Sequence, residues 1–149
     1  MHNQKIIIGI GGNIKSEDGD HPVMVAMKAI SYLKDYSIYV TDKSRWYETE
    51  PIPKSNQPNF FNCIVFAKTV LNELDVLNSL HEIEYRLGRR RTLVNEARVI
   101  DLDLIDYSNK ILRNKEIVIP HPRAHQRRFV MEPLAELDNN WVHPILKLN

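Results

Sequence analysis

Two aspartates, Asp101 and Asp103, interrupt an otherwise apolar run at positions 99–105. If this run forms a β-strand, both aspartates lie on one face, because side chains alternate between the two faces of a strand. Neighbouring carboxylates repel each other and are costly to desolvate unless a positive charge compensates them. Mg²⁺ is commonly held by one or two carboxylates together with substrate phosphates. The pair therefore indicates a site for metal-assisted phosphate chemistry, and the alternative is two edge-strand aspartates that face solvent.

Arginines gather on both sides of this aspartate run. Of ten arginines, five fall within positions 86–98 and three within positions 123–128, whereas the ten lysines are scattered. These eight arginines are Arg86, Arg89, Arg90, Arg91, Arg98, Arg123, Arg127 and Arg128. A guanidinium suits multidentate contacts to phosphate. Either cluster alone is compatible with a solvated charged face, but two clusters around paired carboxylates favour an anionic ligand.

A second candidate site lies at the start of the apolar run 59–69. Phe60 and Asn62 share one face of the expected strand, with Cys63 on the other. An aromatic ring beside a carboxamide offers stacking and a donor–acceptor pair, which a flat heterocycle requires. Phe60 also suits an ordinary core position, whereas a half-buried Asn62 must find hydrogen-bond partners.

Two further groups of residues suit an anionic ligand. His81 and Glu84 are three residues apart on an expected helix, where a local surface pair is the alternative. The segment 120–129 begins with prolines, contains two histidines and three arginines, and ends at Phe129, whose ring is available for stacking. A metal site on His121 and His125 is compatible with their spacing but lacks evident further ligands.

Covalent catalysis has no evident nucleophile in this sequence. The glycines at 9–12 are not followed by the Gly-Lys-Ser/Thr of a phosphate-binding loop, and no Gly-x-Ser-x-Gly motif is present. The single cysteine, Cys63, lies in an apolar run, which predicts a buried reduced thiol. Phosphoryl-type transfer needs no covalent nucleophile, since it depends on Mg²⁺, on cations near the moving oxyanions and on positioning.

The composition predicts one soluble globular domain covering residues 1–149, with 43% hydrophobic and 26% charged residues. A net charge of +1 argues against a general nucleic-acid binder. The apolar runs are too short for a membrane span, and no signal-peptide pattern opens the chain.

Hydrophobic spacing and turn residues predict the order of elements. Strands are expected at 5–10, 38–47, 59–69, 99–105 and 116–119, and helices at 22–33, 72–87 and 127–137. A turn suits Asn109, and positions 49–58, with three prolines, form an irregular loop. The order β-α-β-β-α-β is that of an α+β, ferredoxin-like core, here with an extra C-terminal hairpin strand and a short helix. In this order the arginine-rich loop leads directly into the aspartate strand.

Six short motifs occur in an order that resembles one known family. They are Gly11-Gly-Asn13, Tyr47-Glu-Thr-Glu-Pro51, Gln57-Pro-Asn-Phe-Phe-Asn62, Glu84 with Gly88-Arg89, Asp101-Leu-Asp103-Leu, and the segment from Pro120 to Leu134. Together they resemble the 6-hydroxymethyl-7,8-dihydropterin pyrophosphokinase family of folate biosynthesis. The resemblance covers nearly the whole chain, and the ordered set is far more specific than any single motif.

The resemblance implies that pyrophosphate is transferred from ATP to the hydroxymethyl group of a reduced pterin, releasing AMP. It implies two Mg²⁺ ions on Asp101 and Asp103, with Arg89 and Arg98 as further catalytic residues. The implied pterin-binding residues are Thr49, Glu50, Ile52, Phe60, Asn62 and Phe129. The implied ATP-binding residues are His81, Glu84, Arg89, Arg98, His121 and Arg127. It also implies a cytoplasmic monomer that acts on small molecules, with no nucleic-acid or membrane partner.

The chain departs from the family pattern in two places. Family members usually carry Trp-Gly-Pro-Arg-Thr before the aspartates, where this chain has Asn-Glu-Ala-Arg98-Val, and a glycine is more usual at Pro53. A non-catalytic pterin- or nucleotide-binding relative is therefore the main alternative, although the paired aspartates and the arginines favour an enzyme. An RNA-binding module is a third reading, but the strand at 59–69 lacks the basic and glycine residues of an RNP1 motif.

Overall fold

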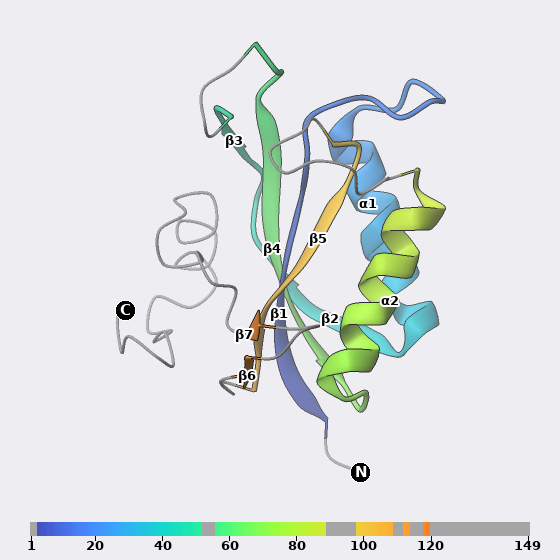
Figure 1. Ribbon diagram of the computed structural model, residues 1–149, viewed down its shortest axis with the longest axis vertical. Coiled ribbons are helices and arrows are strands. Elements are labelled where there is room, and N and C mark those ends of the chain that lie inside the picture. The colour runs from blue at the N-terminus through green and yellow to red at the C-terminus, as the bar shows by residue number, and fades with distance from the viewer. Residues whose placement is uncertain (1–2, 52–55, 89–97, 109–111, 114–117, 120–149) are drawn as a thin grey trace.

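The computed structural model describes residues 3–51, 56–88, 98–108, 112–113 and 118–119 (Figure 1). Its main sheet has five strands that pair antiparallel, in the order β2-β4-β1-β5, with β3 also paired to β4. These strands are β1 (Gln4–Gly12), β2 (Ile38–Lys43), β3 (Tyr47–Thr49), β4 (Phe60–Thr69) and β5 (Asp101–Tyr107). A separate short pair joins β6 (Leu112–Arg113) to β7 (Val118–Ile119).

Two helices lie side by side on one face of the sheet (Figure 1). Helix α1 (Pro22–Leu33) begins with a proline in its first turn, and the Nδ1 atom of His21 accepts a hydrogen bond from the Val23 N–H at 3.0 Å. Helix α2 (Glu73–Arg86) begins after Asn72, whose side chain accepts a bond from the Asp75 N–H at 2.8 Å. The helix expected at 72–87 is therefore confirmed, with Asn72 as its N-cap.

The core lies between the helices and one face of the sheet. Alternate residues of β1 and β5 point into it, and both helices contribute their apolar stripes. Its largest side chains include Ile6, Ile8, Ile10, Leu33, Ile38, Leu80, Ile83 and Leu102. The two helices therefore do not cover the opposite face of the sheet.

The predicted mixture of helices and antiparallel strands is confirmed in its order along the chain. Helix α1 connects β1 to β2, and helix α2 connects β4 to β5. Because β5 follows α2, the chain returns to the sheet edge beside β1 at the two aspartates. The expected turn at Asn109 and the helix at 127–137 lie outside the described residues.

One expected strand, 38–47, is wrong because it is two strands, β2 and β3. The break occurs at Ser44, which is buried and hydrogen-bonds to the backbone of the neighbouring strand β4. Its Oγ accepts a hydrogen bond from the Ile64 N–H at 3.0 Å, and its own N–H donates to the Ile64 carbonyl at 2.9 Å. A serine hydroxyl can replace a strand hydrogen bond in this way. The chain therefore changes direction without leaving β4 unpaired.

Candidate functional site

A row of residues crosses the sheet on the face that the helices leave free. In the strand register, Gly11 of β1 lies opposite Asp101 of β5 and opposite Asn62 of β4, and Asn62 in turn lies opposite Tyr47 of β3. Neighbouring strands are roughly 4.8 Å apart, so the backbones at Asp101 and Asn62 are separated by about 10 Å. The expected metal pair and the expected heterocycle pocket are thus brought to one end of one sheet face.

The aspartates follow the predicted alternation. Asp101 and Asp103 are partly exposed, whereas Leu102 and Leu104 between and after them are buried in the core. The Nη1 atom of Arg98 lies 2.9 Å from Oδ2 of Asp101, and the two side chains are 23% and 15% exposed. A guanidinium therefore compensates the first carboxylate, which removes part of the repulsion expected for this pair.

The aspartate pair fits Mg²⁺ as two hard oxygen donors on one accessible face. Among the described residues there is no group of three or more acidic, histidine or cysteine side chains that could hold a metal ion. An ion at Asp101 and Asp103 would therefore complete its coordination with water or with phosphate oxygens, as Mg²⁺ commonly does.

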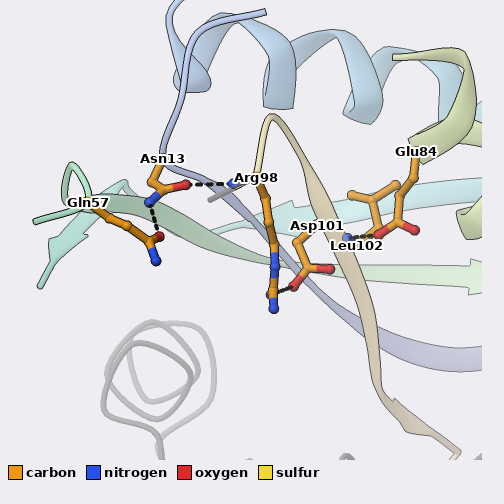
Figure 2. A network of polar contacts seen from close by, with 6 residues as sticks. All are labelled: Asn13, Gln57, Glu84, Arg98, Asp101 and Leu102. Carbon is orange, nitrogen blue, oxygen red and sulfur yellow. Dashed lines mark hydrogen bonds and ion pairs between the residues drawn. The ribbon is translucent and has the colours of Figure 1, made fainter. Parts of the chain in front are cut away.

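Glu84 reaches the aspartate strand from helix α2. Its side chain is only 2% exposed, and its Oε2 accepts a hydrogen bond from the Leu102 N–H at 2.7 Å (Figure 2). Leu102 is the residue between the two aspartates, so this contact fixes the strand backbone at the candidate metal site. The surface-pair alternative for His81 and Glu84 is wrong for Glu84, because only His81 is exposed.

Asn13 joins three parts of the site, a role that the sequence analysis did not predict. The side chain is 2% exposed, and its Nδ2 donates to Gln57 Oε1 at 3.1 Å and to the Pro58 carbonyl at 3.0 Å. Its Oδ1 accepts from the Arg98 N–H at 2.8 Å, and its own N–H donates to the Arg98 carbonyl at 2.9 Å. Figure 2 shows how this one carboxamide connects the end of β1, the segment before β4 and the segment before β5.

The heterocycle side of the site is built by β3 and β4. Asn62 is 7% exposed, and its Nδ2 donates to Thr49 Oγ1 at 3.1 Å, which supplies a partner of the kind expected for this residue. Phe60 lies opposite Thr49 in the register and is partly buried. Glu50 follows β3 and is exposed. Four of the six residues implied for pterin binding therefore lie at one end of the sheet.

Arg86 does not belong to this site, although the sequence placed it in the arginine cluster. Its guanidinium lies over the Tyr32 ring at 4.3 Å, and Nη1 donates to the Tyr36 hydroxyl at 3.1 Å. This hydrogen bond raises the pKa of the Arg86 guanidinium. The contact ties the end of α2 to α1 and to the following 3₁₀ turn at Lys34–Tyr36.

Cys63 is the buried thiol that the sequence predicts. It is 1% exposed, and burial raises its pKa to about 12. Because the thiolate is the reactive form, this cysteine is inert at neutral pH.

Five residues implied by the resemblance lie outside the described part of the chain: Ile52, Arg89, His121, Arg127 and Phe129. Within the described part, no helix is long and apolar enough to cross a membrane.

Comparison with known proteins agrees with these features. The model of the 7,8-dihydro-6-hydroxymethylpterin-pyrophosphokinase (HPPK) family matches residues 7–139. The 2-amino-4-hydroxy-6-hydroxymethyldihydropteridine pyrophosphokinase of Haemophilus influenzae is 34% identical over 92% of this chain and 83% of its own length. The protein of the same name from Bacillus subtilis is 33% identical over 91% of this chain and 78% of its own length.

Longer proteins also contain a similar segment. The folic acid synthesis protein fol1 of Pneumocystis carinii is 32% identical over the whole chain, which spans only 20% of that protein. A crystal structure of Plasmodium falciparum HPPK-DHPS (a triple mutant with pteroate) has the same fold, with a TM-score of 0.69 and 11% identity, over 99% of this chain and 40% of that one. The family model and the two bacterial relatives confirm the resemblance drawn from the motifs, and this chain belongs to the HPPK family.

Proposed function

We propose that this chain transfers pyrophosphate from ATP to the hydroxymethyl group of 6-hydroxymethyl-7,8-dihydropterin and releases AMP. The observation that carries the proposal is the row Asp101–Gly11–Asn62 across the free sheet face. It brings paired carboxylates for a metal–phosphate complex within about 10 Å of a carboxamide suited to a heterocycle edge. The names of the bacterial relatives describe the same chemistry.

The pterin would lie at the β3–β4 end of this row. Asn62 already donates to Thr49, so the carboxamide is held in one orientation before any ligand binds. Phe60 provides an aromatic surface at the same end. By resemblance, Glu50, Ile52 and Phe129 complete the pocket, with Phe129 stacking on the ring opposite Phe60.

The triphosphate would lie at the β5 end. Asp101 and Asp103 would hold two Mg²⁺ ions, which when bound neutralise phosphate charge along the ATP chain. Arg98 pairs with Asp101 in this structure, so its guanidinium lies beside the position where a metal ion on that carboxylate would bind phosphate. By resemblance, His81, Glu84, Arg89, His121 and Arg127 complete the ATP site.

The protein contributes positioning and charge stabilisation to the reaction. The pterin hydroxyl oxygen attacks the β-phosphorus and its proton is released to water, the bond from this phosphorus to the α–β bridging oxygen breaks, and AMP leaves with that oxygen. Arg98 would meet the charge that shifts during this step, and Asn62 would hold the acceptor in line. No residue of this chain has to form a covalent bond.

The strand order and the two helical connections also support a ferredoxin-like assignment for the core. We propose that residues 1–149 act as one domain and as a cytoplasmic monomer on these two small-molecule substrates.

The test is AMP release by the purified protein in the presence of ATP, Mg²⁺ and the reduced hydroxymethylpterin. AMP should form only when all three are present, and diphosphorylated pterin should appear in equal amount. Pterin binding without AMP release would instead support a non-catalytic relative. ATP cleavage that does not depend on pterin would overturn the proposed acceptor.

A further inference from the structure

We infer that Gly11 is a positioning residue for pterin recognition, because the space above its Cα holds the Asn62 carboxamide. This inference rests on the proposed function, in which Asn62 reads the pterin edge. Gly11 itself makes no side-chain contact with any substrate. Its contribution is to leave open the space on β1 into which a side chain from β4 extends.

The geometry at this position is tight. A Cβ atom built on Gly11 would lie 2.2 Å from Asn62 Oδ1 and 3.2 Å from Asn62 Cγ. Contacts below about 3 Å between such atoms are strongly repulsive, so the oxygen would have to move. On its other side, Asn62 is bonded to Thr49 Oγ1 at 3.1 Å. The carboxamide is therefore held between Thr49 of β3 and the bare backbone of Gly11.

The backbone conformation does not require glycine at this position. Positive φ angles among the described glycines occur at Gly19 and Gly88, not at Gly11. Gly11 lies in β1, opposite residues of both β4 and β5, where an alanine can adopt the same backbone. A glycine inside a strand often marks the close approach of another group. Here that group is the Asn62 side chain.

Two neighbouring glycines provide internal comparisons. A Cβ on Gly9 would lie 3.3 Å from Ile105 Cδ1, which is the end of a flexible side chain, so the neighbour can adjust. A Cβ on Gly12 would lie 2.3 Å from the Val99 carbonyl oxygen, so a substitution there would displace the backbone before β5. Of these three glycines, Gly11 is the one at which an added Cβ would contact Asn62, the candidate pterin-binding residue.

The Gly11→Ala substitution should therefore act on pterin binding through Asn62. The displaced carboxamide loses its alignment with Thr49 and with the pterin edge, and misplacement by about 1 Å at such a site can cost up to about 10²-fold. We expect the Kd for 6-hydroxymethylpterin, the oxidised form of the proposed substrate, to rise at least about tenfold. The Kd for ATP with Mg²⁺ should change less than about twofold, because the three atoms nearest to the added Cβ belong to β4 and not to β5.

The experiment is a double-mutant cycle measured by calorimetry on the full chain. Gly11→Ala, Asn62→Ala and the double variant are compared with wild type, and Gly9→Ala is the matched glycine control. If Gly11 acts through Asn62, adding Gly11→Ala to Asn62→Ala should weaken pterin binding little further, since the clashing oxygen is gone and the remaining close contact is with the Phe61 carbonyl oxygen at 3.3 Å. Gly9→Ala should keep the pterin Kd within about twofold of wild type. A merely structural role would instead lower Tm and weaken pterin and ATP binding together.

The outcomes separate this inference from the proposed function. If Asn62→Ala weakens pterin binding and Gly11→Ala does not, the inference is wrong and the proposed function stands. If Asn62→Ala has no effect, the assignment of Asn62 to the pterin fails, and the inference fails with it. Equal losses from Gly11→Ala in both backgrounds would also overturn it. If Gly11→Ala alone does not fold, the double variant should fold normally, and its failure to do so would show that the backbone itself requires glycine.

Discussion

The two ends of the candidate site are held in place by different kinds of contact. The β3–β4 end, with Thr49 and Asn62, belongs to strands that are paired within the sheet, and Thr49 and Asn62 bond to each other. The strand β5 pairs with β1 alone, as β3 pairs with β4 alone, and side chains from elsewhere also hold it. Glu84 reaches it from α2, and Asn13 binds the segment before it. Backbone pairing thus holds both ends, and buried polar side chains hold the phosphate end in addition.

The two ends also differ in charge. The hydrogen bond between Asn62 and Thr49 is neutral, whereas the β5 end contains the Arg98–Asp101 ion pair. The side chains of this pair are 23% and 15% exposed, so they keep some solvent contact and water can replace the bond when the pair rearranges. A neutral, fixed end suits recognition of a flat ring, and a charged, exchangeable end suits a metal–triphosphate complex. Substitutions confined to one end of the site test this difference between the two ends.

The largest expected effect is loss of catalysis at the β5 end. Asp101→Asn and Asp103→Asn should each lower turnover by at least about 10²-fold, because a carboxylate that would hold Mg²⁺ is removed. The Kd for 6-hydroxymethylpterin should stay close to that of wild type. Steady-state AMP release as a function of Mg²⁺, together with calorimetry, measures both quantities. Near-normal turnover in either variant would show that the pair is not the metal site.

A second prediction concerns Arg98, with Arg86 as its control from the same arginine cluster. Arg98→Ala should lower the rate of the chemical step by about 10²-fold, with a smaller effect on substrate affinity, because the guanidinium meets charge that develops during transfer. Arg86→Ala should leave turnover unchanged, since this guanidinium packs on Tyr32 and Tyr36. Single-turnover kinetics decides the matter. Equal rates of the chemical step in the two variants would contradict the different roles given to the two arginines.

Glu84 offers a test of how β5 is held. Glu84→Ala leaves the buried Leu102 N–H without its acceptor, at a cost of about 1–3 kcal/mol in the free energy of unfolding. Glu84→Gln keeps an acceptor oxygen and should cost less. Amide hydrogen exchange at Leu102 should be faster in Glu84→Ala than in Glu84→Gln. If Glu84 instead only binds ATP, both variants should weaken ATP binding and leave exchange at Leu102 unchanged.

Removal of the Asn13 side chain should affect both ends of the candidate site. Its carboxamide bonds to Gln57 and Pro58 before β4, and to Arg98 before β5. Asn13→Ala should therefore weaken pterin and ATP binding together, each by several-fold, as a network shared by two loops predicts. Calorimetry with each ligand gives the two values. A loss confined to one ligand would show that the two ends are positioned independently.

The sequence predicted the features that depend on local rules. Alternation placed Asp101 and Asp103 on one face, Asn72 marked the start of α2, and the apolar run predicted a strand at 59–69 that β4 confirms. Each of these rests on residues within a few positions of one another. The family itself came from the resemblance of six ordered motifs, and not from spacing alone.

The features that the sequence missed depend on residues far apart in the chain. Ser44 ends β2 through Ile64, Asn13 binds Arg98 from 85 positions away, and Arg86 packs on tyrosines about 50 positions earlier. No periodicity encodes such contacts. A half-buried asparagine must have hydrogen-bond partners, which is why the sequence indicates a role for Asn62, whereas nothing near Asn13 in the sequence indicates that it is buried.

The smallest effect is expected at Cys63, which adjoins Asn62 on β4 but is buried in the core on the opposite side of that strand. Burial raises the folded-state pKa of its thiol to about 12 from an ordinary 9.0. The unfolded chain therefore releases this proton at lower pH than the folded protein does. The stabilisation that the buried thiol provides is complete below pH 9.0 and is lost progressively as the pH rises toward about 12.

Comparison with Cys63→Ala isolates this contribution, since the other titrating groups are common to both proteins. The wild type should exceed the variant in free energy of unfolding by a constant amount below pH 9.0, and the difference should shrink above it. Denaturant unfolding at a series of pH values measures this difference. A gap that stays constant into strong alkali, or a thiol that reacts readily with alkylating agents at neutral pH, would show that this side of β4 is open to water. The pterin end would then be less firmly preformed than its strand pairing indicates.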